Sequence, residues 1–334
     1  MKSTDITYVF GAGASCQAMP LVSNFSTRFD SFRNFINTGG FNNASDLVGA
    51  ANEFADQIKS HLSFDTFFKK LFHQKQERNI TRYKCVLLVF FLYEHLLMPE
   101  SEQDSIILEK KYNIDPRYDA LIAGLLKPVM GRTEFYTNIN FITWNYDVNL
   151  EFALHNFLDH NQSFYEFLER HRNEQVFKID DQIKVIHLNG FIYHKTLEYV
   201  FQQTQFVDSI QNIITDFSEQ KLSQWARFIK FAWEGEPSVN EVCDWISDSS
   251  TIILIGYSLP LYNRMVDSKF LNKNIIKDKL LIIQDLKANE IKKIIKSDFG
   301  IVDMFGNSRV AGLPTINLIE NCNSFFVPNS IFPV

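Results

Sequence analysis

The sequence predicts an α/β fold, with a mainly parallel sheet and a large helical insertion. Short apolar runs rich in β-branched residues recur along the chain, and each is followed by glycine or polar residues. Segments with helical spacing of apolar residues separate these runs, and residues 25–131 show helical spacing with no convincing strand. Strands that alternate with helices favour a parallel sheet, in which ligands bind at the carboxyl ends of the strands.

The strands are predicted from apolar runs that end abruptly. The first, Ile6–Phe10, stops at a glycine turn, which is how a doubly wound domain begins. Later runs of the same kind are Asn140–Thr143, Ile183–Leu188, Thr251–Ile255 and Lys279–Ile283. Helical patterns among them cover Asn149–Phe157, Val207–Trp233 and Ala288–Ile295.

The insertion is predicted from its phenylalanine spacing. Phe25, Phe29 and Phe32 follow one another at three- and four-residue intervals, and residues 64–72 repeat the pattern. Such spacing is typical of helices with an aromatic core. The chain is therefore divided into a Rossmann-like domain (1–24 and 132–310), a helical insertion packed on it (25–131) and an irregular, proline-containing C-terminal tail (311–334).

Charge and composition exclude several classes of function. The net charge is −6, and Lys and Arg are interspersed with acids, so no basic stripe is available for a nucleic-acid backbone. The longest apolar run, Cys85–Tyr93, is far shorter than the ~20 residues that span a bilayer, and predicts a buried helix. The N-terminus resembles neither a signal nor a transit peptide, and the 4 cysteines form no CxxC pair. We therefore expect a cytoplasmic protein with no membrane segment and no Cys-based zinc site.

The run Gly11-Ala12-Gly13-Ala14-Ser15 has the form of a phosphate-binding turn. Small residues let the backbone approach a pyrophosphate, and a helix that follows would supply free N–H groups. A tight turn without a ligand is the alternative. The third glycine of a dehydrogenase motif would fall on Cys16, and the ribose-binding acid could only be Asp30, which lies in a helical pattern. The turn thus suits a dinucleotide held differently from the way hydride-transfer enzymes hold it.

A second motif, Thr143-Trp144-Asn145-Tyr146-Asp147, follows an apolar strand and places an amide and a carboxylate two residues apart. Asp147 can equally cap the helix that follows. Considered by themselves, these residues leave a ligand site and a helix cap as open alternatives.

Taken in order, the motifs resemble the sirtuin-like (silent information regulator-like) family, in particular its divergent branch in bacterial anti-phage defence. The glycine turn is followed by Met19-Pro20, the second motif by Glu151, and Ile255-Gly256-Tyr257-Ser258-Leu259-Pro260 comes third. The resemblance extends from residue 6 to roughly residue 285.

The resemblance implies an NAD-binding site. Gly11 to Ser15 would hold the pyrophosphate, Asn145 and Asp147 would lie near the nicotinamide and its ribose, and Gly256 and Ser258 would contact the adenosine side. Pro20, Thr143 and Trp144 are expected among the residues that bind the dinucleotide. Cleavage of the nicotinamide–ribose bond develops oxocarbenium character, which an amide and a carboxylate can accommodate without a metal.

The sequence departs from the family pattern at the expected catalytic histidine. In Ile186-His187-Leu188-Asn189-Gly190, Asn189 occupies the position of the base beside the glycine. His187 lies two residues earlier, on the same face of a strand, and can reach the pocket or be a buried structural histidine. Gln284 and Asp285 can meet the adenosine ribose or form a solvated loop. The zinc cysteines of protein deacetylases are missing, which disfavours protein deacylation.

The expected function is NAD+ hydrolysis, with NAD as substrate, in an antiviral (abortive-infection) defence complex. An uncontrolled NADase would harm its host, so an activating or regulatory protein partner, a homo-oligomer, or both are expected. The alternative is a catalytically weakened subunit that senses NAD or ADP-ribose, and a weaker one is a nucleotide-binding scaffold. The trigger, the oligomeric state and the choice between hydrolysis and cyclisation are left open.

Overall fold

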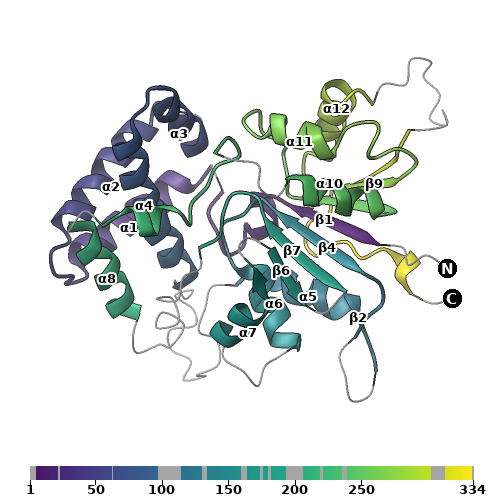
Figure 1. Ribbon diagram of the computed structural model, residues 1–334, viewed down its shortest axis with the longest axis horizontal. Helices are drawn as coiled ribbons and strands as arrows, with labels where there is room; N and C mark the ends of the chain where they lie inside the picture. The colour runs from purple at the N-terminus through teal and green to yellow at the C-terminus, as the bar shows by residue number, and fades with distance from the viewer. Residues whose placement is uncertain are drawn as a thin grey trace.

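The computed structural model describes residues 5–21, 23–61, 63–96, 114–129, 134–158, 164–173, 176–179, 182–192, 206–218, 221–234, 239–301 and 313–332. Within these residues, a sheet flanked by helices lies beside a lobe that consists of helices (Figure 1). The predicted domain boundaries at 131–132 and 310–311 fall outside the described residues.

The predicted parallel sheet is present. Its strand order is β10-β9-β8-β1-β4-β7-β6-β5; neighbours from β10 to β7 are parallel, and β6 and β5 add antiparallel pairs. Each strand expected from the sequence is confirmed to within one residue at its ends. The strands are β1 Ile6–Phe10, β4 Ile139–Thr143, β5 Arg172–Asn173, β6 Val176–Ile179, β7 Ile183–His187, β8 Thr251–Ile255, β9 Leu280–Gln284 and β10 Thr315–Ile319, with β2 Leu126–Lys127 and β3 Glu134–Phe135 as a separate pair.

The order of the strands creates a crevice beside β1. The chain passes from β1 to β4 and β7 on one side, and later places β8, β9 and β10 on the other side. In a doubly wound sheet, ligands bind where this reversal separates the carboxyl ends of adjacent strands. A ligand site is therefore expected at the carboxyl ends of β1 and β8.

Helices cover both faces of the sheet, and the alternation of side chains along β1 assigns each residue to one face. Tyr8 and Phe10 pack in one core with Phe141 of β4 and with α5 and α6, whereas Val9 and Ile142 share a second core with α10, α11 and α12. The flanking helices are α5 Pro116–Leu125, α6 Asn149–Leu158, α7 Phe164–His171, α10 Val239–Asp248, α11 Arg264–Phe270 and α12 Ala288–Asp298.

The helical lobe is built on phenylalanine, as the spacing predicted. The ring of Phe29 lies 5.4 Å from that of Phe54 and 5.2 Å from that of Phe90, and all three side chains are buried. The apolar run Cys85–Tyr93 is buried within α4. No described helix is both long and apolar enough to cross a membrane. The lobe comprises α1 Phe25–Thr38, α2 Ser45–Ile58, α3 Phe64–His73, α4 Glu77–Leu96, α8 Phe206–Ser218 and α9 Ser223–Ala226.

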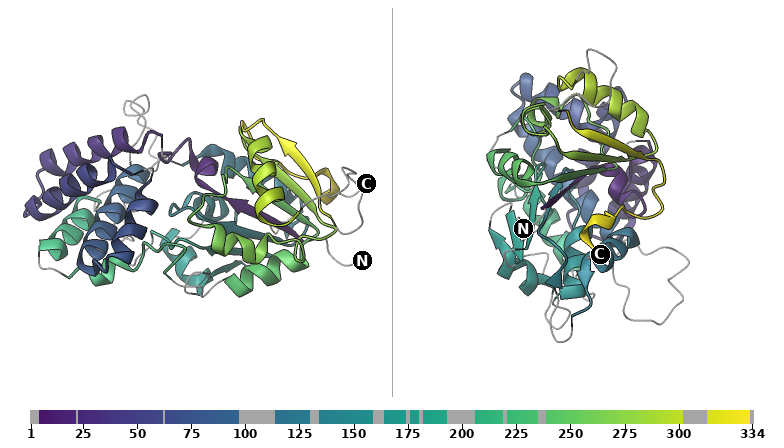
Figure 2. Two further views of the ribbon diagram at one scale, coloured as in Figure 1. Left: turned by 90° about the horizontal axis from the view of Figure 1, so that it is seen from above. Right: turned by 90° about the vertical axis from the view of Figure 1, so that its right-hand side faces the viewer.

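The predicted division of the chain is wrong in two respects. α8 and α9 lie beyond residue 131 yet pack on α2 and α4 (Figure 2), and α5 lies before it yet packs on α6. The spacing of apolar residues predicts a helix but carries no information on which neighbour will cover its apolar face. The lobe is therefore assembled from two separate stretches of chain.

Two element predictions are also corrected. The tail 311–334 is not irregular throughout, because β10 adds to the sheet beside β9; its flanking residues Pro314 and Pro328 lie outside the strand and leave its backbone free to pair. The single helix predicted for Val207–Trp233 is divided, with α8 ending at Ser218 and α9 at Ala226, and Ile229 forms a β-bridge with Gly190.

The turns after β1 and β8 meet backbone to backbone. Gly11 N donates to Ile255 O and Gly13 N donates to Gly256 O, both at 3.0 Å. Gly256 has φ +59°, and a Cβ atom there would lie 2.3 Å from Ala14 N. A Cβ atom on Gly11 would lie 2.6 Å from Gly256 O. Glycine is thus required on both sides of the contact.

We expect Gly256→Ala to be far more destabilising than Gly300→Ala. Both glycines have positive φ, and Gly300 has no atom within 4 Å of a built Cβ, so its substitution costs only the conformational strain of ~1–2 kcal/mol. At Gly256 the overlap with the turn after β1 adds a further ~1–3 kcal/mol. Urea unfolding of the two variants measures the difference, and equal losses of stability would contradict the tight contact.

Candidate functional site

A cleft of about 510 Å³ opens at the carboxyl ends of β1, β4, β8 and β9, and α1, α3 and α4 contribute one wall. Its volume lies within the ~300–1,000 Å³ that small-molecule sites occupy. The turns after β1, β4, β7 and β8 bring Gly11, Asn145, Asn189 and Gly256 into this one cleft. The cleft brings together the predicted residues Gly11, Ala12, Gly13, Ser15, Pro20, Trp144, Asn145, Asp147, Asn189, Gly256, Ser258, Gln284 and Asp285.

Three predicted site residues do not line the cleft. Ala14, Thr143 and His187 are buried behind its surface. The Oγ1 of Thr143 accepts a hydrogen bond from Asn145 N at 3.0 Å and so shapes the turn after β4. Ala14 lies under the glycine turn, where its amide donates to Gly11 O at 2.9 Å.

The glycine turn leads into a single 3-10 turn, Ala12–Ser15, and α1 begins only at Phe25. The helical turn that follows Gly11 is therefore only four residues long. The amide of Gly13 already donates to Gly256 O. Gly11 and Gly13 place bare backbone at the bottom of the cleft, and this part of the lining is called the glycine floor below.

A buried arginine that the sequence did not reveal supports this floor. Arg117 of α5 donates to Ala14 O at 3.0 Å and to Gly13 O at 3.3 Å, and its guanidinium is paired with Asp115. It also donates to Cys322 O at 3.0 Å and lies 4.9 Å from the ring of Phe325. The only local signal was an Asp-Pro pair at the start of a helix, which gives no hint of these distant contacts.

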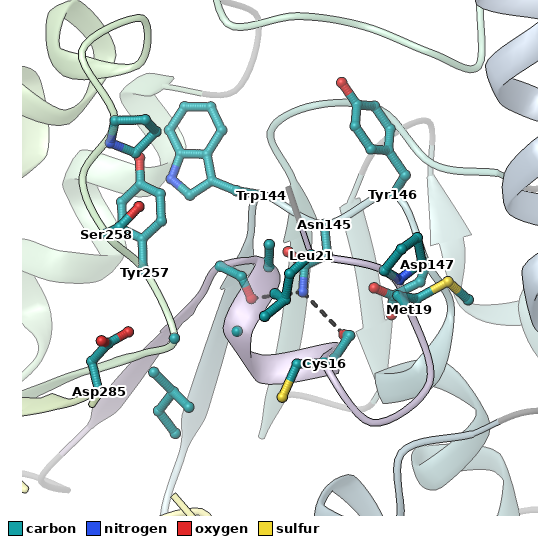
Figure 3. Close-up of a pocket in the computed structure, with 18 of the residues that line it drawn as sticks. Cys16, Met19, Leu21, Trp144, Asn145, Tyr146, Asp147, Tyr257, Ser258 and Asp285 are labelled. Carbon is teal, nitrogen blue, oxygen red and sulfur yellow. Dashed lines mark hydrogen bonds between the residues drawn. The ribbon is translucent and has the colours of Figure 1, made fainter. Parts of the chain in front are cut away.

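Asn145 joins the ends of β1 and β4. Its Nδ2 donates to Gly11 O at 3.0 Å and to Ser15 Oγ at 3.1 Å (Figure 3), which leaves the side-chain oxygen as the acceptor for a ligand. These two hydrogen bonds hold the glycine turn in place, so Asn145 supports the shape of the cleft as well as lining it.

Asp147 holds the turn that leads into α6 and lies one residue before the N-cap position, which is Val148. Its Oδ1 accepts from Asn149 N at 3.1 Å and from Asn149 Nδ2 at 2.7 Å, at the start of α6. Burial raises the pKa of Asp147, while hydrogen bonds from Ser15 and Asn149 oppose the rise. Asp147 also lines the cleft, so this structural role is compatible with contact to a ligand.

His187 lies behind the cleft and is not among the residues that line it. Its Nδ1 lies 3.1 Å from Asn145 O, and because a carbonyl only accepts, Nδ1 carries a hydrogen. Its Nε2 lies 2.7 Å from Glu151 Oε1, so the imidazole and the carboxyl share one more proton. Both ring nitrogens are thus engaged behind the Asn145 backbone, which agrees with a buried structural histidine, the second of the two alternatives.

Two buried polar atoms in the cleft wall have no hydrogen-bond partner among the described residues. They are Nε1 of Trp144 and Oδ1 of Asn189. The side chains are 4% and 6% exposed, and Asn189 Nδ2 donates to Trp144 O at 3.0 Å, so the two residues are held together. A buried unpaired donor or acceptor costs about 1–3 kcal/mol, which a bound polar group would recover.

The opposite side of the cleft carries Ser258 and Asp285 (Figure 3). Asp285 Oδ1 accepts from Lys287 N at 2.7 Å, and the carboxylate lies at the end of β9, where a ribose diol can be bound. Gln284 differs from the expectation. Its amide donates to Asn321 O and Ser324 O and accepts from Phe326 N, so it fixes the C-terminal segment instead of offering a free group to a ligand.

The helical lobe adds an acid that the sequence analysis did not identify. Asp65, in the first turn of α3, lines the cleft and is 6% exposed. Burial raises its pKa to about 7, although a hydrogen bond from Tyr262 opposes the rise. Tyr262 lies in the turn after β8, far away in the sequence, so nothing local to Asp65 indicated its surroundings.

Searches of protein-family models and of curated proteins find no match to this chain. Within the described residues, no three His, Cys, Asp or Glu side chains gather in a way that could hold a metal ion. The four cysteines, two of which line the cleft, are free thiols. The function is therefore argued from the geometry of the cleft.

Asp65→Asn is expected to stabilise the free protein at pH 8 and to leave it nearly unchanged at pH 4. A folded-state pKa of about 7, above the ordinary 3.8, means that the folded state binds the additional proton, so stability falls as the pH rises between these values. The full change in pKa corresponds to at most ~4 kcal/mol. Thermal unfolding across pH 4–8 tests this, and a variant that is less stable than wild type at pH 8 would contradict it.

Proposed function

We propose that the cleft binds NAD+ and that the chain is an NAD+ glycohydrolase of the sirtuin-like type. The observation that carries the proposal is the pair of unpartnered polar atoms, Trp144 Nε1 and Asn189 Oδ1, at adjacent strand ends beside a glycine floor. A buried donor and a buried acceptor on two residues that line the same cleft suit the hydroxyl groups of a ribose, each of which donates and accepts. The order of the motifs supports the dinucleotide over a simpler nucleotide.

In this proposal the glycine floor receives the pyrophosphate, and Arg117 below it adds a positive charge that Asp115 neutralises in part. Asp285 and Ser258 lie on the side assigned to adenosine. Asn145 and Asp147 lie on the side assigned to nicotinamide, across the glycine turn (Figure 3). The cleft is thereby divided into two halves that match the two halves of the dinucleotide.

The reaction breaks the bond between C1′ of the ribose and the ring nitrogen of nicotinamide. Nicotinamide leaves with the bonding electron pair as a neutral molecule, so no acid is needed to protonate it. Water then adds to C1′ and loses a proton, which gives ADP-ribose. Asn145 Oδ1 can orient the water or a ribose hydroxyl, and preorganised dipoles of this kind stabilise developing charge without rearranging.

His187 contributes indirectly in this mechanism. Through Asn145 O it fixes the backbone from which the Asn145 side chain extends, and Glu151 fixes the imidazole in turn. The expected activating or regulatory protein partner, the homo-oligomer, the defence context and the cytoplasmic location remain part of the proposal, and they rest on the resemblance of the motifs.

Trp144→Phe should weaken NAD+ binding and nicotinamide release by about 2–10-fold, the worth of one hydrogen bond of ~0.5–1.5 kcal/mol. The phenyl ring preserves the aromatic contact with Tyr257 and removes only the indole N–H. Trp233→Phe, outside the cleft lining, is the matched control. Nicotinamide release is followed chromatographically, with and without the proteins encoded beside this chain. Equal effects of the two substitutions would remove Trp144 from the site.

A second candidate function is a sensor that binds NAD+ or ADP-ribose without turnover. The specific observation in its favour is that Asn189 stands beside the cleft where the family pattern has histidine, while His187 is engaged behind it. Without a group that accepts a proton at neutral pH, water addition would be slow, whereas binding would be unaffected.

Asn189→His separates the two functions. If the chain is an enzyme held back by Asn189, the variant should release nicotinamide faster by about 10²–10⁴-fold, the usual contribution of a general base. If the chain is a sensor that lacks more than a histidine at position 189, the variant should bind NAD+ without turnover. Binding is measured by calorimetry on the same preparations, and loss of both binding and turnover would argue against an NAD site.

A further inference from the structure

Asp65 reaches the cleft from the helical lobe and has an unusual environment. It is in the first turn of α3, after the N-cap Ser63, and its carboxyl accepts a hydrogen bond from Tyr262. In the described part of the chain, burial, Tyr262 and the backbone of its own helix turn act on this carboxyl, and no Lys or Arg is among the groups that do so. A buried acid without a cation is costly unless a ligand supplies the positive charge.

Aromatic rings surround this end of the cleft. Phe25, Phe64, Phe91 and Tyr146, here called the aromatic wall, all line it. The ring of Phe64 lies 5.4 Å from that of Phe25 and 6.4 Å from that of Tyr146, and the rings of Phe91 and Tyr146 are stacked at 5.1 Å. The faces of such rings attract cations, and a flat ring packs on them as well.

The other titratable groups near Asp65 are neutral or anionic. Tyr146 faces it from the turn after β4, and Tyr262 faces it from the turn after β8. Glu234 acts on Tyr146, and Asp267 acts on Tyr262. Glu234 is paired with Lys84, and burial raises the pKa of Asp267, so neither adds a free charge here. The hydrogen bond from Tyr262 favours the ionised form of Asp65, and none of the described groups that act on this carboxyl supplies a positive charge. A positively charged ligand would supply it.

We propose that Asp65 and the aromatic wall form a subsite that selects a positively charged aromatic ring, so that Asp65 makes the cleft prefer NAD+ over NADH. The nicotinamide ring of NAD+ carries a positive charge, whereas the reduced ring is uncharged and otherwise similar in size. The assignment to NAD+ rests on the proposed function, while the preference for a cationic ring does not. Asp65 is a specificity-determining residue in this arrangement and takes no part in bond cleavage.

The affinity of this subsite for a cation should depend on pH, because binding is coupled to the ionisation of Asp65. Since the carboxyl of the free protein has a pKa of about 7, a cation that favours its ionised form must displace a proton near neutral pH. The affinity for a cationic ring should therefore rise as the pH increases from 6 to 8.5, by about tenfold if only the ionised form binds. The affinity for an uncharged ring should not rise.

The experiment measures binding of small probes to the whole chain by calorimetry at pH 6 and pH 8.5. The probes are 1-methylnicotinamide, which is a cation, and nicotinamide, which is uncharged; NAD+ and NADH form a second pair. The variant is Asp65→Asn, and the matched control is Asp46→Asn, an exposed acid in the first turn of α2. Circular dichroism verifies that each variant is folded.

The expected result is a preference of at least tenfold for the charged probe at pH 8.5 that shrinks at pH 6, disappears in Asp65→Asn and persists in Asp46→Asn. Equal affinity for both probes in wild type at pH 8.5, or a preference that survives Asp65→Asn, would overturn the proposal. If Asp65→Asn does not fold, the pH dependence in wild type decides alone. Selective binding of 1-methylnicotinamide without binding of NAD+ would support the subsite and refute the proposed function.

Discussion

The close contact between the turns after β1 and β8 is the constraint on which the cleft depends. Adjacent parallel strands normally end in side chains that fill the space between them. Here Gly11 and Gly256 bring the two backbones together, and a Cβ atom on Gly256 would lie 2.3 Å from Ala14 N. Gly256 has a positive φ, which glycine adopts without steric cost, and the residues that follow it, Tyr257 and Ser258, line the cleft. The floor of the cleft is consequently bare backbone, which a large polar ligand can approach closely.

Within the described residues, the carbonyl groups of the glycine floor accept hydrogen bonds, whereas two polar atoms in the cleft wall have no partner. Arg117 and Asn145 donate to the carbonyl groups of residues 11, 13 and 14, so the turn keeps its shape without a ligand. In contrast, Trp144 and Asn189 each present a buried polar atom without a partner. Buried polar atoms in proteins are normally paired, so these two distinguish the wall from the floor. In the proposed function, the floor receives the pyrophosphate and the wall binds a ribose.

Local signals in the sequence predicted the elements better than their arrangement. Apolar runs located β1, β4, β7, β8 and β9, because a buried parallel strand needs continuous apolar residues. The edge strand β10 was missed, since its residues are at most partly buried and Thr315 and Asn317 interrupt its apolar residues. Asp65 and Arg117 were missed for another reason: their partners, Tyr262 and Ala14, are distant in sequence, and no spacing rule relates them. His187 was identified, but periodicity gave the face of its strand and not its engagement with Glu151.

The cleft is supported by C-terminal residues that are distant from it in the sequence. Gln284 binds the backbone of residues 321, 324 and 326, and Arg117 binds Cys322 O while its guanidinium lies over Phe325. Phe325 in turn packs against Phe10 at the end of β1, with ring centres 5.7 Å apart. The segment therefore fixes both the arginine below the glycine floor and the strand that leads into it. A stretch that the sequence marked as an irregular tail is, in physical terms, part of the support of the cleft, and two of its residues, Cys322 and Phe325, also line it.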